Sequence, residues 1–149
     1  MNTAMDTGIK RTFEPSEVIV REGDYGDRMY IVKEGRVRIS KTIFGQEKVL
    51  AEIGRGQFFG ELSLINNKDR AATAIAIDHV EVLELDWETF QENIHQHSSV
   101  ARQMIRTLAR RLDNTLEKAN SLNDVLSDRT RDLETKTFEA VEARKVAES

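Results

Sequence analysis

Apolar and polar residues alternate along most of the first half of the chain, and turn residues separate the alternating segments. Val37, Ile39 and Ile43, for example, are separated by polar or charged residues. This period of two is the pattern of a strand with one buried face. Short strands at such even spacing are typical of an antiparallel sandwich or barrel. The expected strands are 17–20, 28–32, 36–43, 47–53, 71–77 and 80–85.

The period changes in the second half, where apolar residues recur at helical spacing. Segment 86–96 begins with an acid, which fits a helix N-terminus, and a break is expected at 97–99. From Val100 onward, a seven-residue repeat can be assigned with Ile105 at position a. The a and d positions of this repeat form a seam along one face of the helix. The seam is mostly apolar through Leu126 and has few large apolar residues afterwards. The a positions are Ile105, Leu112, Ala119, Leu126, Leu133, Ala140 and Ala147, and the d positions are Leu108, Thr115, Leu122, Arg129, Lys136 and Ala143.

This long helix has two interpretations. A dimeric coiled coil over about 100–126 would bury the apolar seam against a second chain. An amphipathic helix that packs on its own β-domain accounts equally well for the first turns. It does not account for the rest of the helix, about seven turns, which extends beyond the surface that a small domain can cover. We therefore expect two parts, a β-domain over 1–98 and a dimerising, signalling helical segment over 99–149.

Glycine and proline support this division, because both residues punctuate turns. All eight glycines lie between Gly8 and Gly60, and the only proline is Pro15. The first half is therefore expected to be rich in turns. Much of the second half can run as uninterrupted helix.

Charge and cysteine content exclude several classes of function. The chain of 149 residues has a formal net charge of −4, which argues against general attraction to nucleic acid or to acidic membranes. The absence of cysteine removes disulfides, thiolate metal sites and cysteine nucleophiles, and it fits a cytoplasmic location. No N-terminal apolar run resembles a signal peptide. No segment approaches the roughly 20 apolar residues of a membrane span.

The stretch FFGELSLINNKDRAATA, residues 58–74, carries the candidate binding chemistry. A short helix that starts near Gly60 would present unpaired N–H groups, and the glycine would let an anion approach them. Arg70 can bind phosphate through a charge-assisted, bidentate contact. Glu61 would repel phosphate but can accept a hydrogen bond from a nearby sugar hydroxyl. These features describe a nucleotide pocket, and the alternative is a surface ion pair between Glu61 and Arg70.

This stretch resembles the phosphate-binding cassette of the cyclic nucleotide-binding domain family, whose pattern is F-G-E-L-[AS]-L, a variable turn and P-R-[AST]-A-T. The nine-residue spacing from Glu61 to Arg70 also matches. Upstream, VIVREGDYGDRMYIVKEGRVRI is similar to the family's I-x-x-x-G-D-x-G-D-x-[ML]-Y-I-[IV]-x-x-G-x-V-x-V, in which the glycines turn the strands. The resemblance covers about residues 13–118. It implies a mainly β fold with C-terminal helices, in which an eight-stranded antiparallel β-roll, or jelly roll, precedes a long dimerisation helix.

The resemblance implies a role for each residue of a cyclic nucleotide site. Glu61 would accept the ribose 2′-hydroxyl, and Arg70 would bind the cyclic phosphate. The other implied contacts are backbone groups of Gly60, Leu62 and Ser63 at the phosphate, Ala71, Ala72 and Thr73 on its far side, and apolar walls from Ile39, Leu50, Ile53 and Phe59.

Two positions bear on the ligand. Family members with threonine or serine directly after the arginine favour cGMP, and this chain has Ala71, which favours cAMP. Asp69 stands where many members have proline. An acid before the arginine also occurs in bacterial catabolite activator proteins, so it is compatible with binding. An inward Asp69 that pairs with Arg70 would weaken the affinity for phosphate.

Residues 109–122, ARRLDNTLEKANSL, resemble the dimer helix of the catabolite activator type. There an arginine and a threonine reach the nucleotide, and the matching positions are Arg111 and Thr115. The next residue reaches the partner's ligand in that type, and Leu116 departs from the polar residue found there. Thr115 is also explained as a tolerated polar d position of a coiled coil.

Other functions have little support in the residues. Activator proteins of this type continue into a helix-turn-helix domain, whereas this sequence continues as a charged tail without a second core, so DNA binding is not expected. His95 and His97 form an H-x-H pair without an accompanying acid-histidine set. No triad, phosphate loop or paired carboxylates appear. We expect no enzyme activity, no metal site and no cofactor apart from the ligand.

The sequence therefore predicts a bacterial-type, cytoplasmic receptor that binds cAMP more readily than cGMP and acts as a homodimer. The nucleotide would bridge the cassette and the C-terminal helix, which would relay the change to an unidentified protein partner or a downstream domain. Two alternatives stay open. The chain could be the N-terminal sensor of a larger signalling enzyme, such as a histidine kinase or a nucleotide cyclase. It could also be a dimeric scaffold that binds no nucleotide.

Overall fold

The computed structural model describes residues 8–148, with side chains described through residue 144. The chain divides into two compact units, and the boundary falls between Ala101 and Arg102. The seam position Ala147 and the first seven residues of the predicted β-domain lie outside the fully described residues. The proposed division of function between 1–98 and 99–149 stays a prediction.

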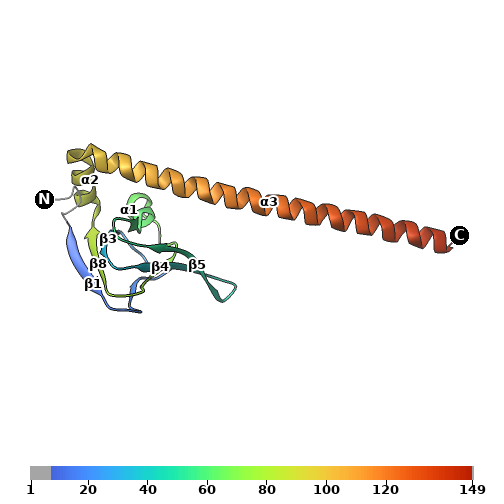
Figure 1. Ribbon diagram of the computed structural model, residues 1–149, viewed down its shortest axis with the longest axis horizontal. Helices are drawn as coiled ribbons and strands as arrows, with labels where there is room; N and C mark the ends of the chain where they lie inside the picture. The colour runs from blue at the N-terminus through green and yellow to red at the C-terminus, as the bar shows by residue number, and fades with distance from the viewer. Residues whose placement is uncertain (1–7, 149) are drawn as a thin grey trace. The chain divides into compact units, whose positions relative to one another are not determined.

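Eight strands within residues 8–148 form two four-stranded antiparallel sheets. The first sheet has the order β1-β8-β3-β6, and the second has the order β2-β7-β4-β5. Figure 1 labels β1, β8 and β3 of the first sheet and β4 and β5 of the second. The predicted antiparallel β fold, followed by a long C-terminal helix, is confirmed. The strands are β1 (Ile9–Phe13), β2 (Val18–Val20), β3 (Met29–Glu34), β4 (Val37–Ile43), β5 (Gln46–Ile53), β6 (Phe58–Phe59), β7 (Thr73–Ala76) and β8 (Val80–Leu85).

The apolar pattern of the sequence misses two of these strands, β1 and β6. In β1, three polar residues separate Ile9 from Phe13, and most of the strand is exposed at the edge of its sheet. An edge strand with little burial carries no clear apolar period. β6 has only two residues, and its assignment depends on pairing with β3. Neither strand is visible without the tertiary fold.

The core of the first unit lies between the two sheets. Alternation along β3 sends Tyr30 and Val32 into this core, whereas Met29 and Ile31 are buried on the opposite face. Burial of one such aliphatic side chain contributes roughly 1.5–3 kcal/mol to stability. The core cluster consists of Tyr30, Val32, Val37, Ile53, Phe59, Ala74, Ala76, Val80 and Val82.

The β4–β5 hairpin turns through Phe44 and Gly45, whose φ angles are 52° and 76°. Ile43 pairs with Gln46 across the loop, so the hairpin has a two-residue loop with two left-handed residues, as a type I′ turn requires. Glycine adopts this conformation freely, but phenylalanine does not. The Phe44 side chain is also fully exposed.

A β-bulge interrupts the same hairpin next to the predicted ligand walls. Ser40 pairs with Val49, but Ile39 pairs with Ala51, so Leu50 is the extra residue. Leu50 is 50% exposed, although the sequence predicts it as an apolar wall of the pocket.

Three helices lie within residues 8–148, namely α1 (Glu61–Asn66), α2 (Trp87–Gln96) and α3 (Ser98–Glu148). The break predicted at 97–99 is only one residue long, His97, because Ser98 and Ser99 already belong to α3. Asp86 caps α2, because its Oδ1 accepts a hydrogen bond from the Thr89 N–H at 2.8 Å. The same hydrogen bonding to Thr89 lowers the pKa of Asp86. Over residues 8–148, no helix has the combination of length and apolar composition that crossing a membrane requires.

Candidate functional site

The cassette begins at Gly60, the residue that separates β6 from α1. Its φ is 82°, and no side chain caps the helix there. A Cβ atom at this position would lie 2.9 Å from Arg70 Nη1 and 3.1 Å from the Arg28 carbonyl oxygen. Both the backbone conformation and the close packing therefore favour glycine. The helix predicted to start near Gly60 is present as α1.

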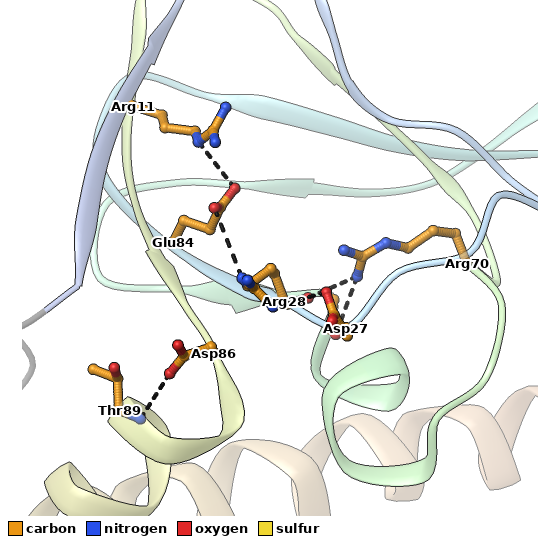
Figure 2. A network of polar contacts seen from close by, with 8 residues as sticks. Arg11, Asp27, Arg28, Arg70, Glu84, Asp86 and Thr89 are labelled. Atoms are coloured by element: carbon orange, nitrogen blue, oxygen red, sulfur yellow. Dashed lines mark hydrogen bonds and ion pairs between the residues drawn. The ribbon is translucent and has the colours of Figure 1, made fainter.

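Arg70 is buried, with only 7% of its surface exposed. Its Nη1 donates hydrogen bonds to the carbonyl oxygens of Arg28 at 2.8 Å and of Gly60 at 3.3 Å (Figure 2). Its guanidinium carbon lies 5.6 Å from the centre of the Tyr30 ring, which is within cation–π range. A surface ion pair does not describe this arrangement, because Arg70 is buried and donates to main-chain oxygens.

The loop EGDYGD, residues 22–27, holds Arg70 by its main chain and its side chain. The Arg70 N–H donates to the Asp24 carbonyl at 2.8 Å, and the Gly23 N–H donates to the Arg70 carbonyl at 2.8 Å. A Cβ atom at Gly26 would overlap the Arg70 guanidinium. Gly26 thus makes room for Arg70, a role that the sequence alone does not assign to it.

The end of the cassette is tied to the same loop. Thr73 Oγ1 accepts a hydrogen bond from the Glu22 N–H at 3.0 Å. Glu22 Oε1 in turn accepts a hydrogen bond from the Thr42 N–H, on β4, at 2.9 Å. Three segments that are distant in sequence therefore meet at the residues predicted to flank the phosphate.

A polar network surrounds the buried carboxylate of Glu84 on the β1-β8-β3-β6 sheet (Figure 2). Glu84 is 9% exposed and follows Val80 and Val82 on the inward side of β8. Its carboxylate lies 3.0 Å from Arg11 Nε and 4.0 Å from Arg28 Nε. The network therefore brings two cations to one buried acid.

Tyr30 joins this network through its hydroxyl, which hydrogen-bonds to Glu84. Burial of the tyrosine and the negative charge of Glu84 raise the pKa of Tyr30 to about 12. Tyr30 therefore keeps its proton and stays a hydrogen-bond donor throughout the physiological pH range.

The other predicted residues of the first unit differ in burial. Ile53 and Phe59 belong to the core cluster, and Ile39 packs against it. Glu61 is half-buried in the first turn of α1. The remaining ones are Leu62, 47% exposed, Ser63, buried, Ala71, exposed, and Ala72 and Thr73, both half-buried.

Arg111 and Thr115 lie on α3, in the second unit, one helical turn apart. The Thr115 hydroxyl donates a hydrogen bond to the Arg111 carbonyl at 2.9 Å. This bond satisfies a polar side chain within the helix itself. Contacts of these two residues with a nucleotide stay a prediction.

The sequence alone did not identify Gly26, Arg28 and Tyr30 as neighbours of Arg70, nor Glu84 as a partner of Tyr30 and Arg28. The inward position of Glu84 can be predicted from the sequence, because Glu84 continues the alternating series of Val80 and Val82, which face the core. A charged residue at such a position predicts a buried polar partner. Its actual partners come from β1 and β3 and require the sheet order to be known.

The histidines give no sign of a metal centre. His79 Nδ1 lies 3.1 Å from Glu14 Oε1 at an exposed position. Among residues 8–148, no group of three or more histidine, aspartate or glutamate side chains is placed to hold a metal ion.

The fold and the cassette together define a ligand-binding β-roll. The model of the family described as the cyclic nucleotide-binding domain matches residues 10–97, more than half of the chain. The chain belongs to the cyclic nucleotide-binding domain family.

Individual relatives agree with this assignment. The Cyclic AMP receptor protein of Thermus thermophilus is 38% identical over 104 residues, which cover 69% of this chain and 48% of that protein. The crystal structure of the Thermus thermophilus catabolite activator protein gives a TM-score of 0.71 at 35% identity, over 83% of this chain and 57% of that one. The cAMP-bound EAL enzyme Bd1971 gives a TM-score of 0.55 at 29% identity, over 80% of this chain and 32% of that one. The chain thus spans about half of the length of the Cyclic AMP receptor protein that it matches.

Proposed function

We propose that the chain is a receptor module for a cyclic nucleotide and that it binds cAMP in preference to cGMP. The position of Arg70 carries this proposal. A guanidinium has five N–H donors, and among the described residues only Nη1 of Arg70 finds acceptors. The remaining donors of Arg70 are not among the fully buried atoms that lack a partner, so they are open to the oxygens of an anion. A cyclic phosphate supplies one negative charge and the oxygen acceptors.

The neighbours of Arg70 suit the rest of such a ligand. Glu61, in the first turn of α1, would accept the ribose 2′-hydroxyl, and the N–H groups of that turn would face the phosphate. Ala71 offers no hydroxyl to guanine, which supports cAMP. The other proposed contacts are Gly60, Leu62 and Ser63 at the phosphate, Ala72 and Thr73 on its far side, Ile39, Leu50, Ile53 and Phe59 as apolar walls, and Arg111 and Thr115 from α3.

The long helix supports a second part of the proposal, a homodimer that relays the signal. α3 has 51 residues, and its a positions Ile105, Leu112 and Leu126 are 66%, 59% and 51% exposed. A helix with such an apolar stripe gains most of its stability when a partner covers the stripe. A second copy of the same helix would do so. A nucleotide that contacts both the cassette and α3 would then favour one arrangement of the dimer.

We propose that the relay regulates another protein or domain. This proposal is made by analogy with the Cyclic AMP receptor protein among the relatives. We place the module in a bacterial cytoplasm, where α3 would act on a protein partner or a downstream domain. The module itself would carry no catalytic step.

Isothermal titration calorimetry of the purified chain with cAMP and with cGMP tests the ligand. We expect saturable binding of one cAMP per chain, with a Kd at least severalfold lower than that of cGMP. Tighter binding of cGMP would show that Ala71 does not set the specificity. No heat with either nucleotide would favour the dimeric scaffold that binds no ligand.

One observation favours a second function, the sensor segment of a larger signalling enzyme. The chain aligns with only 32% of the cAMP-bound EAL enzyme Bd1971, so a related β-roll occurs within a longer enzyme. Sequencing of the complete reading frame decides this point. A catalytic domain encoded after residue 149 would support the sensor segment, and a stop codon there would exclude it.

A further inference from the structure

The Tyr30 ring contacts the Arg70 guanidinium, and Glu84 contacts Tyr30 and Arg28. Neither Tyr30 nor Glu84 is among the predicted contacts to the nucleotide. We propose that Tyr30 and Glu84 are positioning residues that fix the Arg70 guanidinium for phosphate binding. This inference rests on the proposed function, because it assigns the phosphate contact to Arg70. Tyr30 and Glu84 act only through that arginine.

The first route runs through the Tyr30 ring. The guanidinium carbon of Arg70 lies over this ring, 5.6 Å from its centre. Both residues are buried, at 6% and 7% exposure, and cation–π attraction is strongest between groups shielded from water. The ring is held in turn by Phe59, with ring centres 5.1 Å apart and planes inclined by 18°. A rigid aromatic surface therefore supports one side of the charged group.

The hydroxyl of Tyr30 fixes the direction of that ring. Tyr30 and Glu84 are direct cross-strand partners in the β3–β8 ladder, and the hydroxyl hydrogen-bonds to the carboxylate. With a pKa of about 12, the phenol stays protonated and the bond persists over the working pH range. This bond limits rotation of the ring about its side-chain torsions.

The second route runs through Arg28. One carboxylate oxygen of Glu84 lies 4.0 Å from Arg28 Nε, while the Arg28 carbonyl accepts the 2.8 Å hydrogen bond from Arg70 Nη1. The other oxygen pairs with Arg11 Nε at 3.0 Å. Glu84 thus contacts Arg11 closely and Arg28 at the limit of ion-pair distance, and Arg28 Nη1 also pairs with Asp27 Oδ1 at 2.8 Å. Removal of the Glu84 charge would weaken its contacts with the Tyr30 hydroxyl and with the Arg28 side chain.

A purely structural role for Tyr30 makes a different prediction. If the ring only filled the core, its loss would weaken nucleotide binding by the same factor whether or not Arg70 is present. If it acts through Arg70, the two effects are coupled and do not add. A double-mutant cycle on cAMP binding separates these cases.

The cycle uses calorimetric Kd values for the wild type, Tyr30→Leu, Arg70→Ala and the double variant. We expect Tyr30→Leu to raise the Kd for cAMP about tenfold, since a desolvated cation–π contact of this kind is lost. In the Arg70→Ala background the same change should alter the Kd less than about twofold. Tyr30→Phe keeps the ring and should restore affinity to within about threefold of wild type. Phe138→Leu is the control aromatic substitution, because Phe138 is 66% exposed and is not among the proposed contacts to the nucleotide, and it should leave the Kd unchanged.

Equal fold-losses from Tyr30→Leu in both backgrounds would overturn the inference, and so would an unchanged Kd in Tyr30→Leu alone. If circular dichroism shows that Tyr30→Leu does not fold, the cycle is run with Glu84→Gln, which preserves size. That variant should raise the Kd about threefold or more, again only when Arg70 is present, and no change would overturn the inference. A wild type that binds no cAMP, or Arg70→Ala with wild-type affinity, would refute the proposed function as well. If cAMP binding depends on Arg70 but the effects of the two substitutions in the cycle simply add, the positioning role is refuted and the proposed function is not.

Discussion

Gly26 lies directly against the guanidinium of Arg70, although the two residues are far apart in the chain. A Cβ atom on Gly26 would overlap Nε, Cζ and Nη2 of that side chain. The clash falls on the flexible end of the arginine rather than on backbone, so the fold can accommodate it by moving Arg70. We therefore expect Gly26→Ala to raise the Kd for cAMP tenfold or more, with a small effect on thermal stability. Calorimetry and thermal unfolding measure the two effects separately.

Gly54→Ala is the matched control for this substitution. The nearest atom to a Cβ at Gly54 is Gln57 Oε1 at 3.8 Å, an ordinary van der Waals distance. Its cAMP affinity should equal that of the wild type. Wild-type affinity in Gly26→Ala would show that the position of the guanidinium does not matter for binding.

The Asp86 cap should contribute measurably to the stability of α2. Asp86→Ala leaves the Thr89 N–H without its acceptor, and we expect a loss of about 1 kcal/mol in the free energy of unfolding at pH 7. Asp86→Asn can still accept this bond and should lose less. Urea unfolding followed by the fluorescence of Trp87, the only tryptophan, gives these values.

The same cap predicts a pH dependence. The pKa of Asp86 is lowered in the folded chain by its hydrogen bonds with Thr89. The carboxylate therefore contributes its full stabilisation above the ordinary aspartate pKa of 3.8, and this is lost as the pH falls through the lower folded value. The stability difference between wild type and Asp86→Ala should shrink as the solution is acidified below about pH 4. A difference that stays constant to pH 2 would contradict the assigned cap.

The sequence predicts those parts of the fold whose side chains alternate or repeat, and it fails where tertiary contacts decide. β3, β4 and β8 bury alternate apolar residues, so their existence follows from local pattern. β1 is mostly polar and β6 is two residues long, so both depend on their partners. The helix of the cassette follows from the glycine and the acid at its start. The surroundings of Arg70 do not, because the loop that holds it lies more than forty positions away.

Leu50 shows a similar limit within the candidate site. The alternating apolar pattern predicts that Leu50 lies on a regular strand. The register of β4 and β5 instead makes Leu50 the extra residue of a bulge. A bulge changes the direction of a side chain without leaving a signal in apolar periodicity. Its proposed contact with the nucleotide therefore depends on the hairpin more than on the strand pattern.

Phe44 occupies a turn position that its side chain does not favour. Its φ is 52° and its side chain is fully exposed, so it gains no burial in the chain described here. Asparagine tolerates left-handed backbone, and Asn-Gly is the preferred type I′ pair. We expect Phe44→Asn to stabilise the chain by about 1 kcal/mol and to raise the Tm by roughly 2–4 °C. Phe44→Ala keeps the strain and should not raise it. A lower Tm in Phe44→Asn would mean that the exposed ring is stabilising.

The proposed dimer predicts a position-dependent effect along α3. Leu126→Glu places a charge on the apolar seam and should weaken dimerisation at least tenfold in sedimentation experiments. Phe138→Glu changes a side chain that is 66% exposed and lies away from the a and d positions, so it should have little effect. Equal effects of both variants would argue against this seam.

The proposed binding site depends most on Arg70 as the ligand for the cyclic phosphate. The direct measurement is a calorimetric titration of cAMP into the wild type and into Arg70→Ala under the same conditions. Hydrogen bonds to a charged group contribute about 1.5–3 kcal/mol, so the variant should bind cAMP roughly 10- to 150-fold more weakly. A Kd for Arg70→Ala within about threefold of the wild-type value would contradict the phosphate role of Arg70 and, with it, the proposed binding site.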